Sequence, residues 1–529
     1  MRDFESAGRS VVTARHGMIA TSHPASSLVG IEILKAGGKA IDAAVAACAV
    51  QCVVEAGSTG IGGDCFALLS DGGSTDIRAY NGSGRTPAGL DLDVIERQPE
   101  KTIGRSSPHA VTVPGAVEAW ARLIADHGRM PLADLLAPAI AIAREGYAVS
   151  PRTAFDIGNQ RALLAADPAA CATFLVDGEA PETGSVQRQP ALAATLEAIG
   201  RDGPDAFYRG EIAREMAEFL RERGGAHTVD DFAAAAGEYV EPIAADYRGW
   251  TVHECPPNGQ GVIALLILRI LEHFVLPAGP ADFETLRLEV AATRFAYAAR
   301  DAAIAEGDPE GQVARLLSDN FVRELADRVR DGEAPDTAQI PMPVEHSDTV
   351  HISVVDRERN AVSFINSIFH PYGSGLMTPR SGVLFHNRGQ SFSLKRGHPN
   401  CIAPRKRPMH TIIPGMLSRD GRVVMPFGVM GGHYQAMGHA WLLSRLIDHG
   451  LDLQEAIDQA RLFPLPNSSD IEMEGRLRAS VGDAFRKEGF DVRPPHWPIG
   501  GAQAVWIDWA HDTLRGASDP RKDGCALGY

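Results

Sequence analysis

The sequence predicts an α+β protein in which helices cover β-sheets. Apolar residues at helical spacing dominate most of the chain before residue 331, whereas β-branched segments punctuated by glycine dominate the part after residue 348. The 529 residues are 44% hydrophobic, which is enough to fill a large core. No internal repeat is visible, so the chain is expected to form one large layered structure or a few domains.

The charge balance limits the partners. The chain has 67 acidic and 51 basic residues, a formal net charge of −16, and no long basic run. A negative protein repels the phosphate backbone, so we expect no nucleic acid partner. The most apolar windows, residues 43–50 and 262–268, are too short to cross a bilayer, so we expect no membrane partner either.

The N-terminus and the cysteines indicate the compartment. Acidic side chains lie near the N-terminus, where a secretory signal peptide would carry its apolar run. The seven cysteines are scattered and form no CxxC pair, which is typical of thiols in a reducing compartment. The expected location is the cytoplasm.

Two helices and a glycine-rich loop are predicted near the N-terminus. Ser26 or Ser27 is a candidate N-cap for the first helix, and an Ala-rich, buried second helix follows over residues 40–52. The loop 57–64 then leads into a strand at 66–69. A phosphate-binding loop joins a strand to a helix N-terminus, whereas this loop joins a helix to a strand. We therefore interpret its glycines as close backbone packing.

The remaining elements follow in order. Residues 110–240 are expected to be mostly helical, because prolines punctuate short amphipathic runs. Residues 331–348 are rich in Pro, Asp, Glu and Ala without periodicity, which indicates an exposed linker. After it, residues 349–356 and 361–366 form a predicted hairpin. Further strands are predicted at 247–255, 382–385, 411–413 and 423–425, and further helices at 262–273, 282–330 and 435–448.

Thr349 is the candidate nucleophile. It begins a strand directly after the linker, and Asp348 precedes it. A threonine hydroxyl attacks well only when a base lies within hydrogen-bond reach. Cleavage of the chain before Thr349 would supply one, because the freed α-amino group has an unperturbed pKa near ~8. The local sequence alone also allows a purely structural threonine at the start of a strand.

Motifs that extend along nearly the whole chain give Thr349 a context. Thr349–Asp356 is followed by Asn360–Ser363. Other motifs are Gly60–Gly63, Val113–Gly115, Ala137–Ala139, Gly373–Gly375, Ser381–Leu384, Asn387, Arg407–Pro408, Met430–Gly432, Asp519–Arg521 and Gly528–Tyr529. In this order they resemble the γ-glutamyltransferases, which are N-terminal-nucleophile hydrolases that process themselves.

The resemblance implies a fold and a maturation. The implied fold is a four-layer αββα sandwich. The implied product of maturation is a large chain, residues 1–348, and a small chain, residues 349–529, split from one precursor. The two chains are expected to stay associated, and a dimer of such heterodimers is left open.

The resemblance also implies roles for four residues. Thr349 matches the catalytic threonine that is freed by cleavage after Asp348, and Ser367 matches a hydroxyl that hydrogen-bonds near it. Gly431 and Gly432 match the pair whose N–H groups form the oxyanion hole. Glycines suit this task because two donors must converge on one oxygen without a side chain in the way. Without the resemblance, the same glycines would be interpreted as an ordinary turn before a helix.

The substrate-binding positions depart from the family pattern. γ-Glutamyl enzymes hold the α-carboxylate of the substrate with an arginine and its α-amino group with an aspartate, and the matching positions here are Ser83 and Ser391. An asparagine contact becomes Phe369. Losing the arginine and the aspartate removes a bidentate carboxylate partner and a counter-charge. We therefore expect a different amide substrate, held by a site that includes Asn81, Ser83, Ser391 and, in place of a serine pair, His410 and Thr411.

Three segments of this sequence are similar to one branch of the family. Asn366–Gly373, Asn387–Gly389 and Gly431–Gln435 are similar to the oxamate amidohydrolases, which release ammonia from a small acid amide in purine breakdown. The predicted reaction is the hydrolysis of oxamate to oxalate and ammonia. Arg388 is then the first candidate for binding the substrate carboxylate and Arg85 the second, although either could be a structural salt-bridge arginine. γ-Glutamyl transfer, glutathione hydrolysis and cleavage of another acyl amide stay open.

The sequence also bears on two other classes of function, a metal hydrolase and a non-catalytic binding protein. Histidines are frequent between His346 and His439, yet no HExxH, HxH or Cys pair at ligand spacing is present, so we expect no metal and no other cofactor. His351, on the same strand face as Thr349, either orients the site or packs in the core. A non-catalytic binding protein is the third class, and the intact Thr349 and Gly431–Gly432 argue against it.

Overall fold

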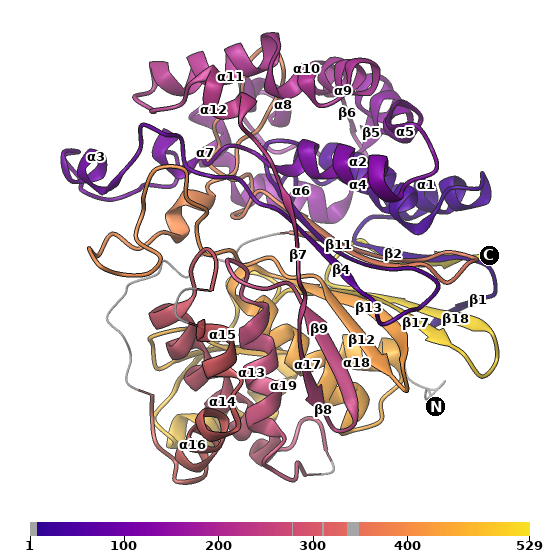
Figure 1. Ribbon diagram of the computed structural model, residues 1–529, viewed down its shortest axis with the longest axis vertical. Helices are drawn as coiled ribbons and strands as arrows, with labels where there is room; N and C mark the ends of the chain where they lie inside the picture. Colours follow the sequence, from indigo (N-terminus) through magenta and orange to yellow (C-terminus); the bar gives the residue numbers. More distant parts are fainter. Residues whose placement is uncertain (1–7, 278, 309–310, 336–348) are drawn as a thin grey trace.

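The computed structural model describes residues 8–277, 279–308, 311–335 and 349–529. Two seven-stranded sheets face each other, and helices cover the outer side of each sheet (Figure 1). These layers confirm the expected αββα sandwich. None of the described helices is both long and apolar enough to span a lipid bilayer.

The first sheet has the strand order β19-β2-β10-β11-β3-β4-β7, and every neighbouring pair is antiparallel. Its centre is the predicted hairpin, in which Val350 of β10 pairs with Asn366 of β11. Both strands are buried throughout, because a helical layer covers one face and the second sheet covers the other. The strands are β2 Met18–Thr21, β3 Asp64–Ser70, β4 Arg78–Gly82, β7 Glu238–Val240, β10 Val350–Val355, β11 Ala361–Ser367 and β19 Cys525–Gly528.

The second sheet has the order β1-β18-β17-β13-β12-β9-β8 and is also antiparallel. Phe66 and Leu68 of the first sheet meet Met416 and Val505 of the second in the apolar core between the sheets. The strands are β1 Val12–Ala14, β8 Ile243–Tyr247, β9 Trp250–Glu254, β12 Gly415–Arg419, β13 Arg422–Met430, β17 Gly501–Asp508 and β18 Thr513–Ser518.

The helices form two layers with separate cores. The predicted Ala-rich helix is α2, and all of its residues are buried because it is apolar on every side. The layer on the first sheet includes α1 Pro24–Lys35, α2 Ala40–Val54, α4 Ala116–His127, α5 Leu132–Glu145, α9 Pro190–Asp202, α10 Asp205–Tyr208, α11 Glu211–Glu222 and α12 Val229–Ala233. The layer on the second sheet includes α13 Gly261–Leu271, α14 Phe283–Ala303, α15 Gln312–Leu316, α16 Asp319–Arg330, α17 Gln435–Ile447, α18 Leu453–Asp458 and α19 Gly475–Lys487.

Short elements complete the described chain. The remaining helices are α3 Leu92–Glu96, α6 Pro151–Asn159, α7 Arg161–Ala165 and α8 Pro168–Phe174, with single 3₁₀ turns at η1 Pro108–Ala110, η3 Arg388–Ser391 and η4 Gly432–Tyr434. Two small sheets contain β5 Tyr147–Ala148 with β6 Val186–Gln187, and β14 Leu462–Pro464 with β15 Asp470–Met473 and β16 Asp491–Arg493.

Three local predictions were wrong. The N-cap of α1 is His23, whose Nδ1 accepts the Ala25 N–H at 3.2 Å, because Pro24 fits the first helical position without needing an N–H partner. Residues 382–385 and 411–413 form isolated bridges or loop contacts and no ladder strand. Their N–H groups bond to turns and side chains, as Ile413 N–H does to Gln435 Oε1 at 3.1 Å.

Candidate active site

Thr349 lies at the start of β10, and its side chain is buried. Because Val350 pairs with Asn366, the same register places Thr349 opposite Ser367 at the end of β11. The Thr349 hydroxyl donates to Ser367 Oγ at 3.2 Å and accepts from Gln435 Nε2, at the start of α17, at 3.4 Å. The expected cleavage partner Asp348 lies outside the described residues.

The glycine-rich loop before β3 packs against Ser367. A β-carbon on Gly63 would lie 2.3 Å from the Ser367 carbonyl oxygen, and one on Gly62 would lie 2.2 Å from the Leu384 carbonyl oxygen. Neither position therefore has room for a side chain. This agrees with the interpretation of the loop as close backbone packing, here beside the candidate nucleophile.

Gly431 and Gly432 form the turn between β13 and α17. Their φ angles are 119° and 57°, in the left-handed region that favours glycine. The Gly432 carbonyl oxygen accepts from Gln260 Nε2 at 3.0 Å, and the same turn leads into Gln435, which contacts Thr349. The turn therefore lies next to the Thr349 hydroxyl, where an oxyanion hole is expected.

Arg388, in η3, is a buried cation, and one edge of its guanidinium, formed by Nε and Nη2, makes no hydrogen bond to the described residues. Its Nη1 donates to Thr411 Oγ1 at 2.7 Å. Burial lowers the pKa of Arg388 to about 9, with Asp64 acting in the opposite direction, so the guanidinium is charged at neutral pH. Nε and Nη2 form the edge with which an arginine binds a carboxylate through two parallel bonds.

Phe369 connects Arg388 to the candidate nucleophile. Its backbone N–H donates to Ser367 Oγ at 2.9 Å, and its ring centre lies 4.0 Å from the Arg388 guanidinium carbon. Its φ angle of 76° is uncommon for an aromatic residue and is a local strain of the kind found at ligand sites. Direct contacts through Phe369 therefore link Arg388 to the Ser367–Thr349 pair.

His410 is committed to a buried carboxylate. Its Nδ1 accepts the Ile412 N–H at 3.3 Å, so its Nε2 carries the proton and donates to Asp64 Oδ2 at 3.0 Å. Burial and the nearby Arg388 lower the pKa of His410 to about 3, which keeps the ring neutral. Burial raises the pKa of Asp64, but His386 and His410 outweigh it and hold it well below its usual range. His410 thus anchors the loop that carries Thr411.

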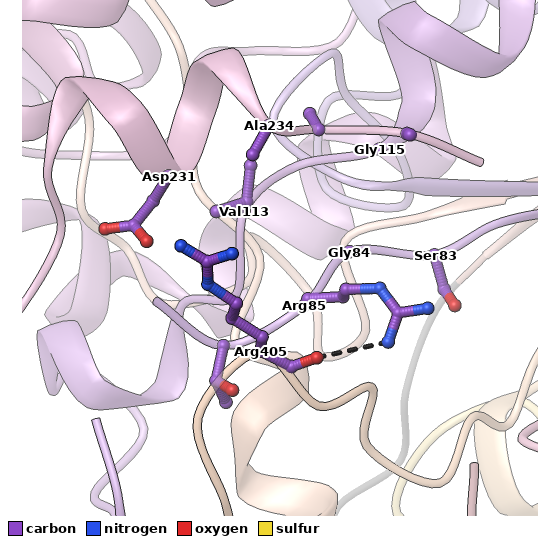
Figure 2. A pocket seen from close by; sticks show the side chains of 11 residues that line it. Ser83, Gly84, Arg85, Val113, Gly115, Asp231, Ala234 and Arg405 are labelled. Atoms are coloured by element: carbon purple, nitrogen blue, oxygen red, sulfur yellow. Dashed lines mark hydrogen bonds between the residues drawn. The ribbon is translucent and has the colours of Figure 1, made fainter. Parts of the chain in front are cut away.

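Asn81 lies in β4, and Ser83 and Arg85 follow it at a pocket that neither Thr349 nor Arg388 lines. Ser83 Oγ donates to Asn81 Oδ1 at 2.7 Å. Ser83 and Arg85 line a pocket of about 320 Å³ together with Arg405 (Figure 2). Arg85 forms an ion pair with Glu306 and donates to the Arg405 carbonyl oxygen at 3.1 Å. Its guanidinium is therefore already occupied, in contrast to that of Arg388.

Ser391 lies in η3 beside a small cavity that Arg300 also lines. Its Oγ is buried and has no hydrogen-bond partner within the part of the chain that the structure describes. The sequence predicted no role for Gln260 or for Gln435, which ends the segment Gly431–Gln435 of the resemblance, because local sequence does not show which groups a glutamine side chain will bond. Across the described residues, no three or more His, Cys, Asp or Glu side chains gather in a way that could hold a metal ion.

Comparisons with known proteins agree along the chain. The family model described as Gamma-glutamyltranspeptidase matches residues 26–529. The chain is 34% identical to the glutathione hydrolase-like YwrD proenzyme of Bacillus subtilis over 526 residues, covering 97% of this chain and 98% of that protein. It is 36% identical to the oxamate amidohydrolase proenzyme of Klebsiella pneumoniae over 530 residues, with the same coverage of 97% and 98%. The crystal structure of cephalosporin acylase from Bacillus halodurans is similar in fold, with a TM-score of 0.91, 35% identity and coverage of 100% of this chain and 99% of that one.

Proposed function

The chain belongs to the γ-glutamyltranspeptidase family of N-terminal-nucleophile hydrolases and is an enzyme; from that premise we propose that it hydrolyses oxamate to oxalate and ammonia. The proposal includes maturation, in which the precursor is cut after Asp348 and Thr349 becomes the free N-terminus of the small chain. Two of the similar proteins are called proenzymes, which supports this step.

The strand order supports an enzyme of two chains that stay together. In the first sheet, β10 and β11 of the small chain lie between β2 and β3 of the large chain. In the second sheet, β12 of the small chain pairs with β9 of the large chain. A cut at residue 348 would therefore leave two interleaved chains that share both sheets, the core between them and the cores of the two helical layers.

The proposed chemistry uses Thr349 as nucleophile. Its α-amino group removes the hydroxyl proton, Oγ1 attacks the amide carbonyl carbon, and ammonia leaves with a returned proton, which gives an oxalyl ester on Thr349. Water then attacks this ester and releases oxalate. The N–H groups of Gly431 and Gly432 stabilise the oxyanion of both tetrahedral intermediates, and Ser367 orients the threonine hydroxyl.

The edge of Arg388 formed by Nε and Nη2 is the observation that carries the substrate assignment. A buried guanidinium whose Nε and Nη2 have no acceptor among the described residues is costly, and a ligand carboxylate would satisfy both groups. In oxamate the carboxylate is bonded directly to the amide carbonyl carbon, so the charged group and the reacting group are adjacent. Arg388 contacts Phe369, which contacts Ser367, which in turn bonds to Thr349. A short, planar substrate of this kind suits an arginine in that position.

Cleavage of a bulkier acyl or γ-glutamyl amide is the second candidate. It is favoured by the likeness to a glutathione hydrolase-like protein and a cephalosporin acylase. The serines at positions 83 and 391 speak against γ-glutamyl substrates, because they supply neither charge for the two ends of a glutamyl group.

An ammonia-release assay tests the proposal. Purified, processed enzyme is incubated with oxamate and, in parallel, with glutathione and a chromogenic γ-glutamyl amide. We expect kcat/KM for oxamate to exceed that for glutathione. Efficient glutathione hydrolysis without ammonia from oxamate would assign the protein to the γ-glutamyl branch instead.

A further inference from the structure

Two side chains of helix α14 form hydrogen bonds with the residue that follows Gly431 and Gly432. Tyr297 and Arg300 are three residues apart and lie on one face of this helix. The Tyr297 hydroxyl donates to the His433 carbonyl oxygen, and Arg300 Nη1 lies 3.1 Å from His433 Nδ1. Because a guanidinium can only donate, His433 Nδ1 accepts this bond. The residue that follows Gly432 is therefore held at both its backbone and its ring.

Gln260 connects Arg300 to Gly432 by hydrogen bonds. Arg300 Nη1 also donates to Gln260 Oε1 at 3.0 Å, while Gln260 Nε2 donates to the carbonyl oxygens of Gly432 and Thr411 at 3.0 and 2.8 Å. These bonds fix the direction of the amide, because a flipped amide would direct its oxygen at two carbonyl oxygens. Arg300 thus supports the orientation in which Gln260 Nε2 faces the turn.

The environment of Arg300 is unusual for a residue that only fills the core. Its side chain is fully buried, Nε pairs with Asp301 Oδ1 at 2.8 Å, and its guanidinium carbon lies 4.3 Å from the Tyr297 ring centre. Its Nη2 has no acceptor among the described residues. A buried guanidinium with an unsatisfied donor is costly where an apolar side chain would serve. Its polar bonds, apart from that to Asp301, are directed at the glycine turn.

We propose that Arg300 is a positioning residue that orients the oxyanion-binding turn through Gln260 and His433. The inference rests on the proposed function only in that Gly431 and Gly432 bind the oxyanion. If their N–H groups are held in place by this network, its loss lowers the stabilisation of the transition state more than it weakens substrate binding. Removing one oxyanion donor typically costs about 10²–10³ in kcat, so losing only its orientation should cost about 10–10².

The test compares Arg300→Met and Arg300→Lys with Arg294→Met. Arg294 lies on the same helix, half-buried over Phe490, and its one bond to a described residue is a long 3.5 Å bond to the Ser468 carbonyl oxygen, away from the glycine turn. Activity is measured per processed molecule with oxamate, or with glutathione if the unaltered enzyme does not hydrolyse oxamate. This choice separates failure of the substrate assignment from failure of the present inference. We expect kcat to fall about 10–10²-fold in Arg300→Met with a smaller change in KM, partial recovery in Arg300→Lys, and near-normal kcat in Arg294→Met.

A double-mutant cycle separates positioning from general stability. If Arg300 acts through Gln260, then Gln260→Leu alone should lower kcat similarly, and the double variant should lose far less than the product of the two single losses. Independent losses that multiply would overturn the inference. So would a folded Arg300→Met enzyme with normal kcat, or an Arg294→Met enzyme that loses as much activity. If Arg300→Met does not fold, normal kcat in folded Gln260→Leu would equally overturn it.

Discussion

The ring of Phe369 lies 4.0 Å from the guanidinium carbon of Arg388, and its backbone N–H donates to Ser367 Oγ, the atom that also receives the Thr349 hydroxyl bond. One residue therefore touches both the buried cation and the partner of the proposed nucleophile. Phe369 has a left-handed backbone conformation, with its N–H and its ring directed at these two different neighbours. Phe369 therefore links the buried cation to the Ser367–Thr349 pair through direct contacts.

Maturation should depend on Thr349. The unaltered protein should run on denaturing gels as two fragments, and Edman sequencing of the smaller one should begin Thr-Val-His-Ile-Ser. Thr349→Ala should stay full length because it lacks the hydroxyl, whereas Thr349→Ser should still split, since it keeps one. Splitting of Thr349→Ala at the same bond would show that another group performs the cleavage.

Activity should depend on the glycine turn. Valine at position 432, where φ is 57°, is strained and would displace the neighbouring N–H groups. We expect Gly432→Val to reduce kcat by about 10²–10³ in processed enzyme. Gly450→Val is the matched control, because Gly450 has a φ of 63° and open space around a β-carbon after α17. Equal kcat values in the two variants would leave the turn with a structural role only.

Substrate binding should depend on Arg388. A charge-assisted hydrogen bond is worth about 1.5–3 kcal/mol, so Arg388→Ala should raise KM for oxamate by roughly 10–100-fold. Arg388→Lys should recover only part of this loss, because a lysine cannot form the two parallel bonds. Arg85→Ala should have the smaller effect, since Arg85 is paired with Glu306. Steady-state kinetics decide, and a larger effect at Arg85 would reverse the assignment of the two arginines.

The sequence predicted those parts of the site that lie in local patterns. Thr349 stands out because a linker without periodicity ends where a β-branched strand begins, and the hairpin register then places Ser367 opposite it. The state of Arg388 could not be predicted, because it depends on its contacts with Thr411 and Phe369 and on two donors that no acceptor in the described ranges reaches. These neighbours converge only after two sheets and a loop have packed together.

The same limit applies to the elements that were predicted wrongly. Residues 411–413 have the β-branched composition of a strand, yet their hydrogen bonds go to Gln260 and Gln435. β-propensity expresses how well a side chain fits a half-buried surface and does not determine which partner the backbone finds. The two glutamines that recruit this segment lie in other parts of the sequence, so no local window contains the information.

The pH dependence of oxamate hydrolysis should show two limbs. The proposed base, the α-amino group of Thr349, must be deprotonated, so kcat/KM should rise with pH through its ordinary pKa near ~8. Burial lowers the pKa of Arg388 to about 9, against the influence of Asp64. Above that pH the free enzyme loses the positive charge that attracts the carboxylate. kcat/KM, which reports the free enzyme, should therefore fall again at high pH.

The high-pH limb can be assigned with one variant and one comparison. Arg388→Gln carries no titrating group at this position, so its lower kcat/KM should no longer fall as the pH rises through 9. In the unaltered enzyme, a bound carboxylate stabilises the protonated guanidinium, so the same limb should lie at higher pH in the kcat profile than in the kcat/KM profile. The measurement is a pair of pH profiles from pH 6 to the limit of enzyme stability, checked by recovery of activity at neutral pH. A high-pH limb that persists unchanged in Arg388→Gln would mean that another group titrates there.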